Sequence, residues 1–245
     1  MNPSHANTPA ASGNELLLLC LDLQPVFLRT IADTESVQRR CAFAIQAAAG
    51  LGIDIAFTEQ VPQKLGGTAP ELLSLAPSAT PFGKNCFSAF ADDGIRDSIS
   101  SRKIEHLLLC GAKAVTDLSP LARLPRLKVL HLCNTQASDL SPLHALPLIV
   151  LKLSGSAVTD LSPLRGLELQ SLMLDGTAVR DFSPLLDCKK LVNLVVPTGA
   201  PGIEVLKQHP ALKYLSTKWD SRLNRPDTTV DEFWKKVGNA DSEVP

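Results

Sequence analysis

A five-residue motif recurs at nearly constant spacing in the second half of the chain. Asp-Leu-Ser-Pro-Leu begins at Asp117, Asp139 and Asp160, and Asp181 begins a fourth copy in which Phe replaces the first Leu. The copies are offset by 22, 21 and 21 residues. A self-similar unit of this length indicates stacked supersecondary units, each of which buries the apolar face of its neighbour.

A short Leu-x-Leu segment precedes each copy of the motif. The two outer residues of such a segment point to the same side of a strand, because side chains alternate along it. In the motif itself, we expect Asp to cap a short helical turn and Pro to lie where its missing N–H does no harm. This pattern is typical of leucine-rich repeats and predicts such an array over residues 104–216. The segments are Leu107–Leu109, Leu130–Leu132, Leu151–Leu153, Leu172–Leu174 and, after the last copy, Leu194–Val196.

The repeats are expected to end in a cap formed by residues 217–245, because an open repeat end needs covering. Thr229 and Glu232 have the spacing of a capping box, and Phe233 gives the following helix an apolar residue. Within the repeats, hydroxyl side chains recur where an Asn usually stands and could satisfy backbone groups in the turn. These are Thr135, Ser156 and Thr177.

The repeated part resembles the internalin-type class of bacterial leucine-rich repeats. That resemblance implies a parallel-sheet solenoid used in protein–protein contact, so we expect an unidentified protein partner on the repeat sheet. The strand positions expected to face this partner, on the concave side, are His131, Lys152, Met173 and Asp175.

The first half of the chain has an α/β pattern. Residues 1–14 are expected to be disordered. Residues 15–23 and 52–58 read as strands on either side of an amphipathic helix over 36–50, followed by a loop over 62–82. A further strand over 104–110 is expected to belong both to this half and to the first repeat. Strand, helix and strand at this spacing predict a parallel, right-handed βαβ unit. The predicted fold is therefore a parallel α/β half, over residues 15–111, that continues into a leucine-rich-repeat solenoid.

Three stretches of residues 15–111 resemble the isochorismatase-like cysteine hydrolases. They are Leu21–Gln24 after the first strand, Thr58-Glu59-Gln60 with the loop that follows, and Lys84 ahead of Phe87-Ser88. In that family an Asp acts as base, a Lys as its charge partner and a Cys thiolate as nucleophile. The resemblance gives the first role to Asp22 and the second to Lys84.

The family's cysteine motif is missing from this chain. After Leu109-Cys110-Gly111 the sequence runs directly into the first repeat, and Asp117 stands where the thiol is expected. A carboxylate is a much poorer nucleophile, and Asp117 already has a capping role. Cys86 and Cys110 are the remaining candidates, and Cys86, two residues after Lys84, is the better placed.

Charge and cysteine spacing bear on the other function classes. The net charge is −1, from 24 basic and 25 acidic residues, and the chain has no basic field that would favour nucleic acid or a membrane surface. The six cysteines and five histidines lack the paired spacing of a metal site, so neither a metal nor another cofactor is expected. The apolar run Leu16–Leu21 is too short for a signal-peptide core, and a cytoplasmic location is expected.

Three hypotheses remain. In one of them the N-terminal half is only a fused fragment that caps the repeats. The main hypothesis is a protein-interaction module whose hydrolase-like half is catalytically silent, with Asp22 and Lys84 a structural ion pair. The alternative is a hydrolase of the isochorismatase family with a displaced nucleophile, Cys86. Whether the chain is an enzyme is left open, and the missing cysteine motif favours the hypothesis of a catalytically inactive N-terminal half.

Overall fold

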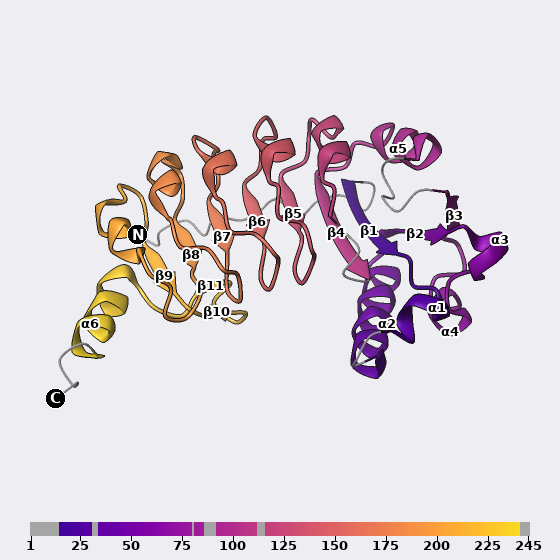
Figure 1. The fold of residues 1–245 in the computed structure, drawn as a ribbon, viewed down its shortest axis with the longest axis horizontal. Helices are drawn as coiled ribbons and strands as arrows, with labels where there is room; N and C mark the ends of the chain where they lie inside the picture. The colour runs from indigo at the N-terminus through magenta and orange to yellow at the C-terminus, as the bar shows by residue number, and fades with distance from the viewer. Residues whose placement is uncertain (1–14, 31–33, 80, 86–91, 112–115, 241–245) are drawn as a thin grey trace. The chain divides into compact units, whose positions relative to one another are not determined.

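The computed structural model describes residues 15–30, 34–79, 81–85, 92–111 and 116–240. The chain divides into two compact units, Met1–Ala112 and Lys113–Pro245. Both units are built on parallel strands, so the predicted α/β fold with a large parallel sheet is confirmed (Figure 1). The predicted disorder of residues 1–14 lies outside the described residues.

The first unit contains four parallel strands in the order β3-β2-β1-β4. β1 (Leu16–Leu21) is central, and its residues pair with β2 (Asp54–Gln60) on one side and β4 (His106–Gly111) on the other. β3 (Pro81–Lys84) pairs only with the carboxyl half of β2. The prediction of parallel strands over 15–23, 52–58 and 104–110 is thus confirmed, while membership of the last strand in the repeat sheet stays a prediction.

Helix α2 (Thr34–Gly50) packs on one face of this sheet and closes the core of the first unit (Figure 1). Leu18, Cys20 and Phe57 point to this side and pack with Ile45 of the helix. Leu17 and Leu19 alternate with them and are buried on the opposite face. A parallel strand covered on both faces reads as a continuous apolar run, which is what Leu16–Leu21 provides.

Several short elements of the first unit were not predicted. The segment expected to be a loop over 62–82 contains two single-turn helices, α3 (Pro62–Leu65) and α4 (Pro70–Leu73), each of which begins with Pro. Two further elements are α1 (Pro25–Leu28) and α5 (Asp93–Ser100). Asp92 caps α5 by accepting the backbone N–H groups of Gly94 and Ile95.

The second unit repeats a strand and a 3-10 helix along a parallel sheet of order β5-β6-β7-β8-β9. The outer residues of the Leu-x-Leu segments in this unit, such as Leu151 and Leu153, are fully buried, as the alternation predicts. The strands are β5 (Val129–His131), β6 (Val150–Lys152), β7 (Ser171–Met173), β8 (Asn193–Val195) and β9 (Tyr214–Ser216). The 3-10 helices are η3 (Ser119–Arg123), η4 (Ser141–Leu143), η5 (Ser162–Leu164), η6 (Ser183–Asp187) and η7 (Ile203–Gln208).

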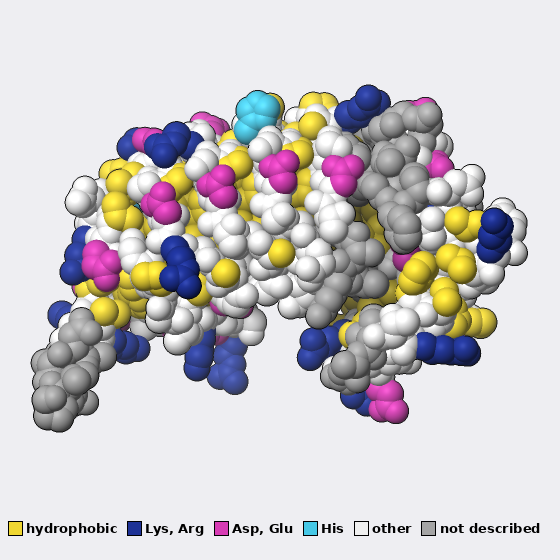
Figure 2. All heavy atoms as spheres, in the orientation of Figure 1, with side chains coloured by type: hydrophobic (Ala, Val, Ile, Leu, Met, Phe, Trp, Pro, Cys, Tyr) yellow, Lys and Arg dark blue, Asp and Glu magenta, His cyan; other side chains and the backbone are white. Residues whose placement is uncertain are grey.

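The Asp of each motif caps its 3-10 helix, as predicted. Its carboxylate accepts the backbone N–H of the Ser two residues later at 2.8–2.9 Å in all four copies. Figure 2 shows acidic side chains at regular intervals along this half of the molecule. The Ser two residues after Asp139 and after Asp160 donates hydrogen bonds from its hydroxyl and from its backbone N–H. These bonds lower the pKa of both carboxyls below the ordinary value, and the hydroxyl is the larger cause. The same groups lower the pKa of Asp181, with the backbone N–H as the larger cause.

These caps make the second unit sensitive to acid. Because the pKa of the carboxyls of Asp139, Asp160 and Asp181 is lower in the folded chain, ionisation stabilises the fold above the unfolded pKa of about 3.9, and that stability is lost as the pH falls through the folded values. We expect the urea midpoint, followed by Trp fluorescence, to fall steeply below about pH 4. The triple variant Asp139→Asn/Asp160→Asn/Asp181→Asn keeps the acceptors without the titration, so its midpoint should depend less on pH. Identical pH profiles would contradict the assignment.

The recurring hydroxyls divide into two groups. Thr135 and Thr177 each donate to the backbone carbonyl three residues earlier, at 2.9 and 2.6 Å. The hydroxyl of Ser156 is buried and has no hydrogen-bond partner among the described residues. The prediction that these side chains satisfy the turn is therefore confirmed for the two threonines and wrong for the serine.

The C-terminal segment forms a two-stranded hairpin, β10 (Trp219–Asp220) and β11 (Arg225–Pro226), and helix α6 (Val230–Ala240). The predicted capping box is present: Glu232 accepts the backbone N–H of Thr229 at 2.8 Å, and Thr229 accepts that of Glu232 at 3.3 Å. α6 packs against β9, the last strand of the sheet, as expected for a cap.

The hairpin bears on Met173, which was expected to face solvent on the repeat sheet. β11 packs against β8 and β9, and the ring of Trp219 lies 5.9 Å from Lys152 Nζ. Lys152, Met173 and Val195 are register partners across neighbouring strands. The hairpin thus touches both ends of this row, and Met173 between them is only 5 % exposed. Its expected place on a solvent-facing binding surface is wrong.

In the part of the chain described here, no helix is long and apolar enough to cross a membrane.

Candidate functional site

A buried ion pair lies at the carboxyl edge of the first sheet. Asp22 directly follows β1, and Lys84 is the last residue of β3, so the parallel topology brings the two strand ends to the same edge. Lys84 Nζ lies 2.8 Å from Asp22 Oδ2. The two residues are 1 % and 5 % exposed. The structure therefore brings together the two residues that the resemblance had singled out.

Two side chains of β2, the strand between them, hold the pair. Thr58 Oγ1 donates to Asp22 Oδ1 at 3.0 Å, and Lys84 Nζ donates to Gln60 Oε1 at 2.7 Å. Gln60 is held in turn, because its backbone N–H donates to Gln24 Oε1 at 2.6 Å. Each charge thus has a charged partner and a neutral one, which a buried ion pair needs if it is to remain ionised.

The backbone at Asp22 aims its carboxylate at this cluster. Its φ is 50°, in the left-handed region, where Asp and Asn are more readily accommodated than other side chains. Its backbone N–H donates to the carbonyl of Thr58 at 3.0 Å, which ties the strand end to β2. A residue of this type in this conformation at a strand end is common in functional sites.

The Thr58-Glu59-Gln60 triplet divides between two faces of β2. Thr58 and Gln60 touch the ion pair, whereas Glu59 lies between them in sequence and accepts the backbone N–H of Thr68 at 2.6 Å. Glu59 therefore anchors the loop after β2. Thr58 and Gln60 were not predicted as contacts of the pair, although strand alternation within the triplet was a usable signal. Gln24, which holds Gln60, was not predicted either.

Three residues were considered for the position of the nucleophile: Cys86, Cys110 and Asp117. Cys86, the preferred candidate, lies outside the described residues. Cys110 lies on β4 and pairs in register with Cys20 of β1. Asp117, which stands where the family thiol is expected, is exposed and caps η3 by accepting the backbone N–H of Ser119 at 2.9 Å. Its role is therefore structural.

Metal-ligating side chains do not gather in groups of three or more His, Cys, Asp or Glu anywhere in the described ranges. Cys20, Cys41, Cys133 and Cys188 form no disulfide among the described residues. Burial raises the pKa of Cys188 to about 11, so this thiol stays protonated at neutral pH.

The remaining residues expected on the repeat face are partly buried. His131 and Lys152 are half-buried, and burial lowers the pKa of Lys152 below its ordinary value. Asp175 accepts a hydrogen bond from the hydroxyl of Ser154 at 2.6 Å. A binding role for these three residues stays a prediction.

Comparison with known families gives a match for the first unit. A family model described as the isochorismatase domain matches residues 16–118. The isochorismatase domain-containing protein 2 of Pongo abelii is 36 % identical over 103 residues, which are 42 % of this chain and 48 % of that protein. The human protein of the same name is 34 % identical over the same shares. The chain thus spans about half the length of the curated relatives it matches.

Solved structures give two kinds of distant likeness. The MAR1 ribonuclease of Caenorhabditis elegans has a TM-score of 0.40 and 24 % identity, with 51 % of this chain and 65 % of that chain covered. An internalin, inlF, of Listeria monocytogenes has a TM-score of 0.45 and 19 % identity, with 66 % of this chain and 52 % of that chain covered.

The isochorismatase match corrects the main functional hypothesis. The sequence was expected to encode chiefly a repeat-based interaction module with an inactive N-terminal half. The family model matches residues 16–118, a range that contains Asp22 and Lys84. Together with the curated relatives, it favours the alternative hypothesis of an isochorismatase-family hydrolase.

Proposed function

We propose that the chain is a hydrolase of the isochorismatase type, with its site at the carboxyl edge of the first sheet. The observation that carries the proposal is the buried contact of 2.8 Å between Lys84 Nζ and Asp22 Oδ2, held by Thr58 and Gln60. A carboxylate held by fixed partners at the carboxyl edge of a parallel sheet is at the edge where such sheets bind ligands, and it can act as a general base there.

In this proposal Asp22 is the general base and Lys84 is its charge partner. A thiol proton passes to Asp22, the thiolate attacks the substrate carbon, and the proton returns to the leaving group. Water then cleaves the covalent intermediate and restores the thiol. Cys86, two residues after Lys84, is the proposed source of that thiol. By resemblance to the family, the substrate classes are vinyl ethers, amides and nicotinamide-type compounds.

For the second unit, we propose a leucine-rich-repeat solenoid as the finer description of its fold. Support comes from the motif spacing, the buried Leu-x-Leu residues and the 3-10 helix that each capping Asp begins. The in-register pairing of β5 to β9 agrees with such a stack.

The test is turnover of one substrate from each class by the full chain and by Asp22→Asn. Asn is accommodated in the left-handed backbone of residue 22 and still accepts a hydrogen bond, but it cannot take a proton. We expect the variant to lose about two to four orders of magnitude in kcat, the usual contribution of a general base. Cys86→Ala should reduce turnover to background.

The matched control is Glu71→Gln, the same carboxylate-to-amide change at an exposed position of α4. It should leave kcat unchanged. Absence of turnover in the wild-type chain on all three substrate classes, or turnover that survives Asp22→Asn, would contradict the proposed function.

A further inference from the structure

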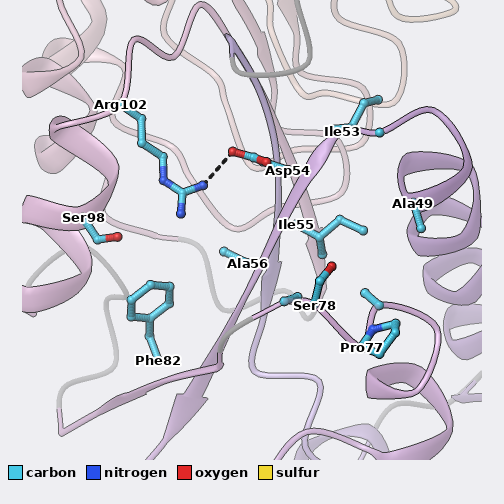
Figure 3. Close-up of a pocket in the computed structure, with 13 residues that line it drawn as sticks. Ala49, Ile53, Asp54, Ile55, Ala56, Pro77, Ser78, Phe82, Ser98 and Arg102 are labelled. Atoms are coloured by element: carbon cyan, nitrogen blue, oxygen red, sulfur yellow. Dashed lines mark hydrogen bonds and ion pairs between the residues drawn. The ribbon is translucent and has the colours of Figure 1, made fainter.

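A recess lies in the first unit, at the amino end of β2 (Figure 3). Its volume is about 530 Å³, which is within the range of small-molecule sites. Because β3 pairs with β2 only from Phe57 onwards, the stretch from Asp54 to Ala56 is left to form one wall. The Asp22–Lys84 pair is held by the other end of the same strand, so the two sites are distinct.

One cation and one anion line this recess. Arg102 Nη1 donates to Asp54 Oδ2 at 3.0 Å, and both side chains are partly exposed. This contact engages one terminal nitrogen of the guanidinium. Figure 3 shows the second terminal nitrogen turned away from Asp54, toward the space between Ser98 and Phe82. A guanidinium carries five N–H donors in a planar fork, so donors remain for a ligand.

The other walls supply a hydroxyl and flat apolar surface. Ser98 and Phe82 lie on the same side of β2 as Arg102, and all three line the recess (Figure 3). Ala56, on the strand itself, is buried and small, which leaves room over the strand. A donor fork and a hydroxyl beside an aromatic ring favour a ligand that is polar at one end and flat at the other.

We propose that this recess binds a small monoanion with a flat apolar group, of which an aromatic carboxylate is the simplest example. The carboxylate accepts hydrogen bonds from the second terminal nitrogen of Arg102 and from Ser98, and the ring packs against Phe82. Such charge-assisted hydrogen bonds are roughly twice as strong as neutral ones, so the charge of the ligand should decide its affinity.

Asp54 gives this proposal a distinctive consequence. Its carboxylate lies beside the guanidinium and repels an incoming anion, so it limits affinity as well as holding Arg102 in place. Removal of the Asp54 charge should therefore strengthen binding, whereas removal of the Arg102 charge should weaken it. A purely structural ion pair would not produce opposite effects.

The experiment measures the binding of benzoate to the full chain by ligand-observed NMR, with neutral benzamide as the matched compound. We expect benzoate to bind at least about ten-fold more tightly than benzamide, the ratio that 1.4 kcal/mol of charge-assisted bonding gives. Arg102→Gln should weaken benzoate binding by about ten-fold or more, and Asp54→Asn should tighten it several-fold.

The two variants control for each other, because both break the same ion pair. If both variants weaken benzoate binding equally, the ion pair only maintains the shape of the recess and the proposal is wrong. Equal binding of benzamide and benzoate would also overturn it, because recognition would then not depend on charge. Loss of benzoate binding in Asp22→Asn would place the ligand at the other end of β2 and would likewise contradict the proposal. These outcomes are independent of hydrolase turnover.

Discussion

Replacement of Lys84 with Met should lower the free energy of unfolding of the first unit by about 3–5 kcal/mol, because loss of one partner strands a buried charge. Lys84 is 1 % exposed, and Asp22 would keep only the hydroxyl of Thr58 from its present side-chain partners. The same change should remove hydrolytic turnover, since the proposed base loses its counter-charge.

Two signals weight the two units differently during urea unfolding. Both Trp residues, Trp219 and Trp234, belong to the second unit, so fluorescence reports on that unit. Far-UV circular dichroism includes α2, a helix of 17 residues in the first unit. We expect Lys84→Met to shift the dichroism transition to lower urea.

Two further variants test the cause of this shift. Lys64→Met makes the same change at an exposed position of α3 and should cost less than about 0.5 kcal/mol. Adding Asp22→Asn to Lys84→Met should recover part of the loss, because the stranded charge is gone. Equal stability of Lys84→Met and Lys64→Met would show that the buried pair contributes nothing.

Truncation of one repeat leucine should have a comparable effect on the second unit. Leu151 is fully buried in β6, in register with Leu130 and Leu172 of the neighbouring strands. We expect Leu151→Ala to cost about 2–5 kcal/mol, because a cavity opens between strands that cannot close around it. Tryptophan fluorescence during urea unfolding measures the loss.

The matched control is Leu223→Ala, which makes the same change at a leucine that is 52 % exposed. It should alter stability by less than about 0.5 kcal/mol. A similar loss from both variants would mean that burial of the Leu-x-Leu residues does not stabilise the stack.

Periodicity allowed much of the second unit to be predicted. The motif spacing located the repeats, the capping Asp residues and the inward leucines, because each depends on neighbours close in sequence. In the first unit, the apolar run Leu16–Leu21 and the following helix gave the βαβ unit in the same way. The short elements β3 and α5 were missed: β3 has four residues, including Pro and Gly, and α5 has one turn signal, Asp92, ahead of a largely polar segment.

The candidate site was predicted only in part. A motif resemblance singled out Asp22 and Lys84, but nothing local to either residue indicates that they touch across 62 positions. The parallel order β3-β2-β1 decides this, and it also places Thr58 and Gln60 of β2 against the pair. Because side chains alternate along β2, Glu59 points to the other face and accepts a hydrogen bond from the loop that follows the strand.

Features that depend on near neighbours in the chain could be predicted before the fold was known: the repeat period, the capping residues, the inward leucines and the βαβ order. Features that depend on distant segments became visible only in the folded chain. Met173 has the strand position of a solvent-facing residue, yet the hairpin of β10 and β11, about fifty residues later, covers its row. The recess beside Arg102 has a similar origin, because α5 and β2 meet only in the folded chain. Local patterns fix which face of a strand is apolar, but the element that covers that face is set by long-range packing, which no short window of sequence contains.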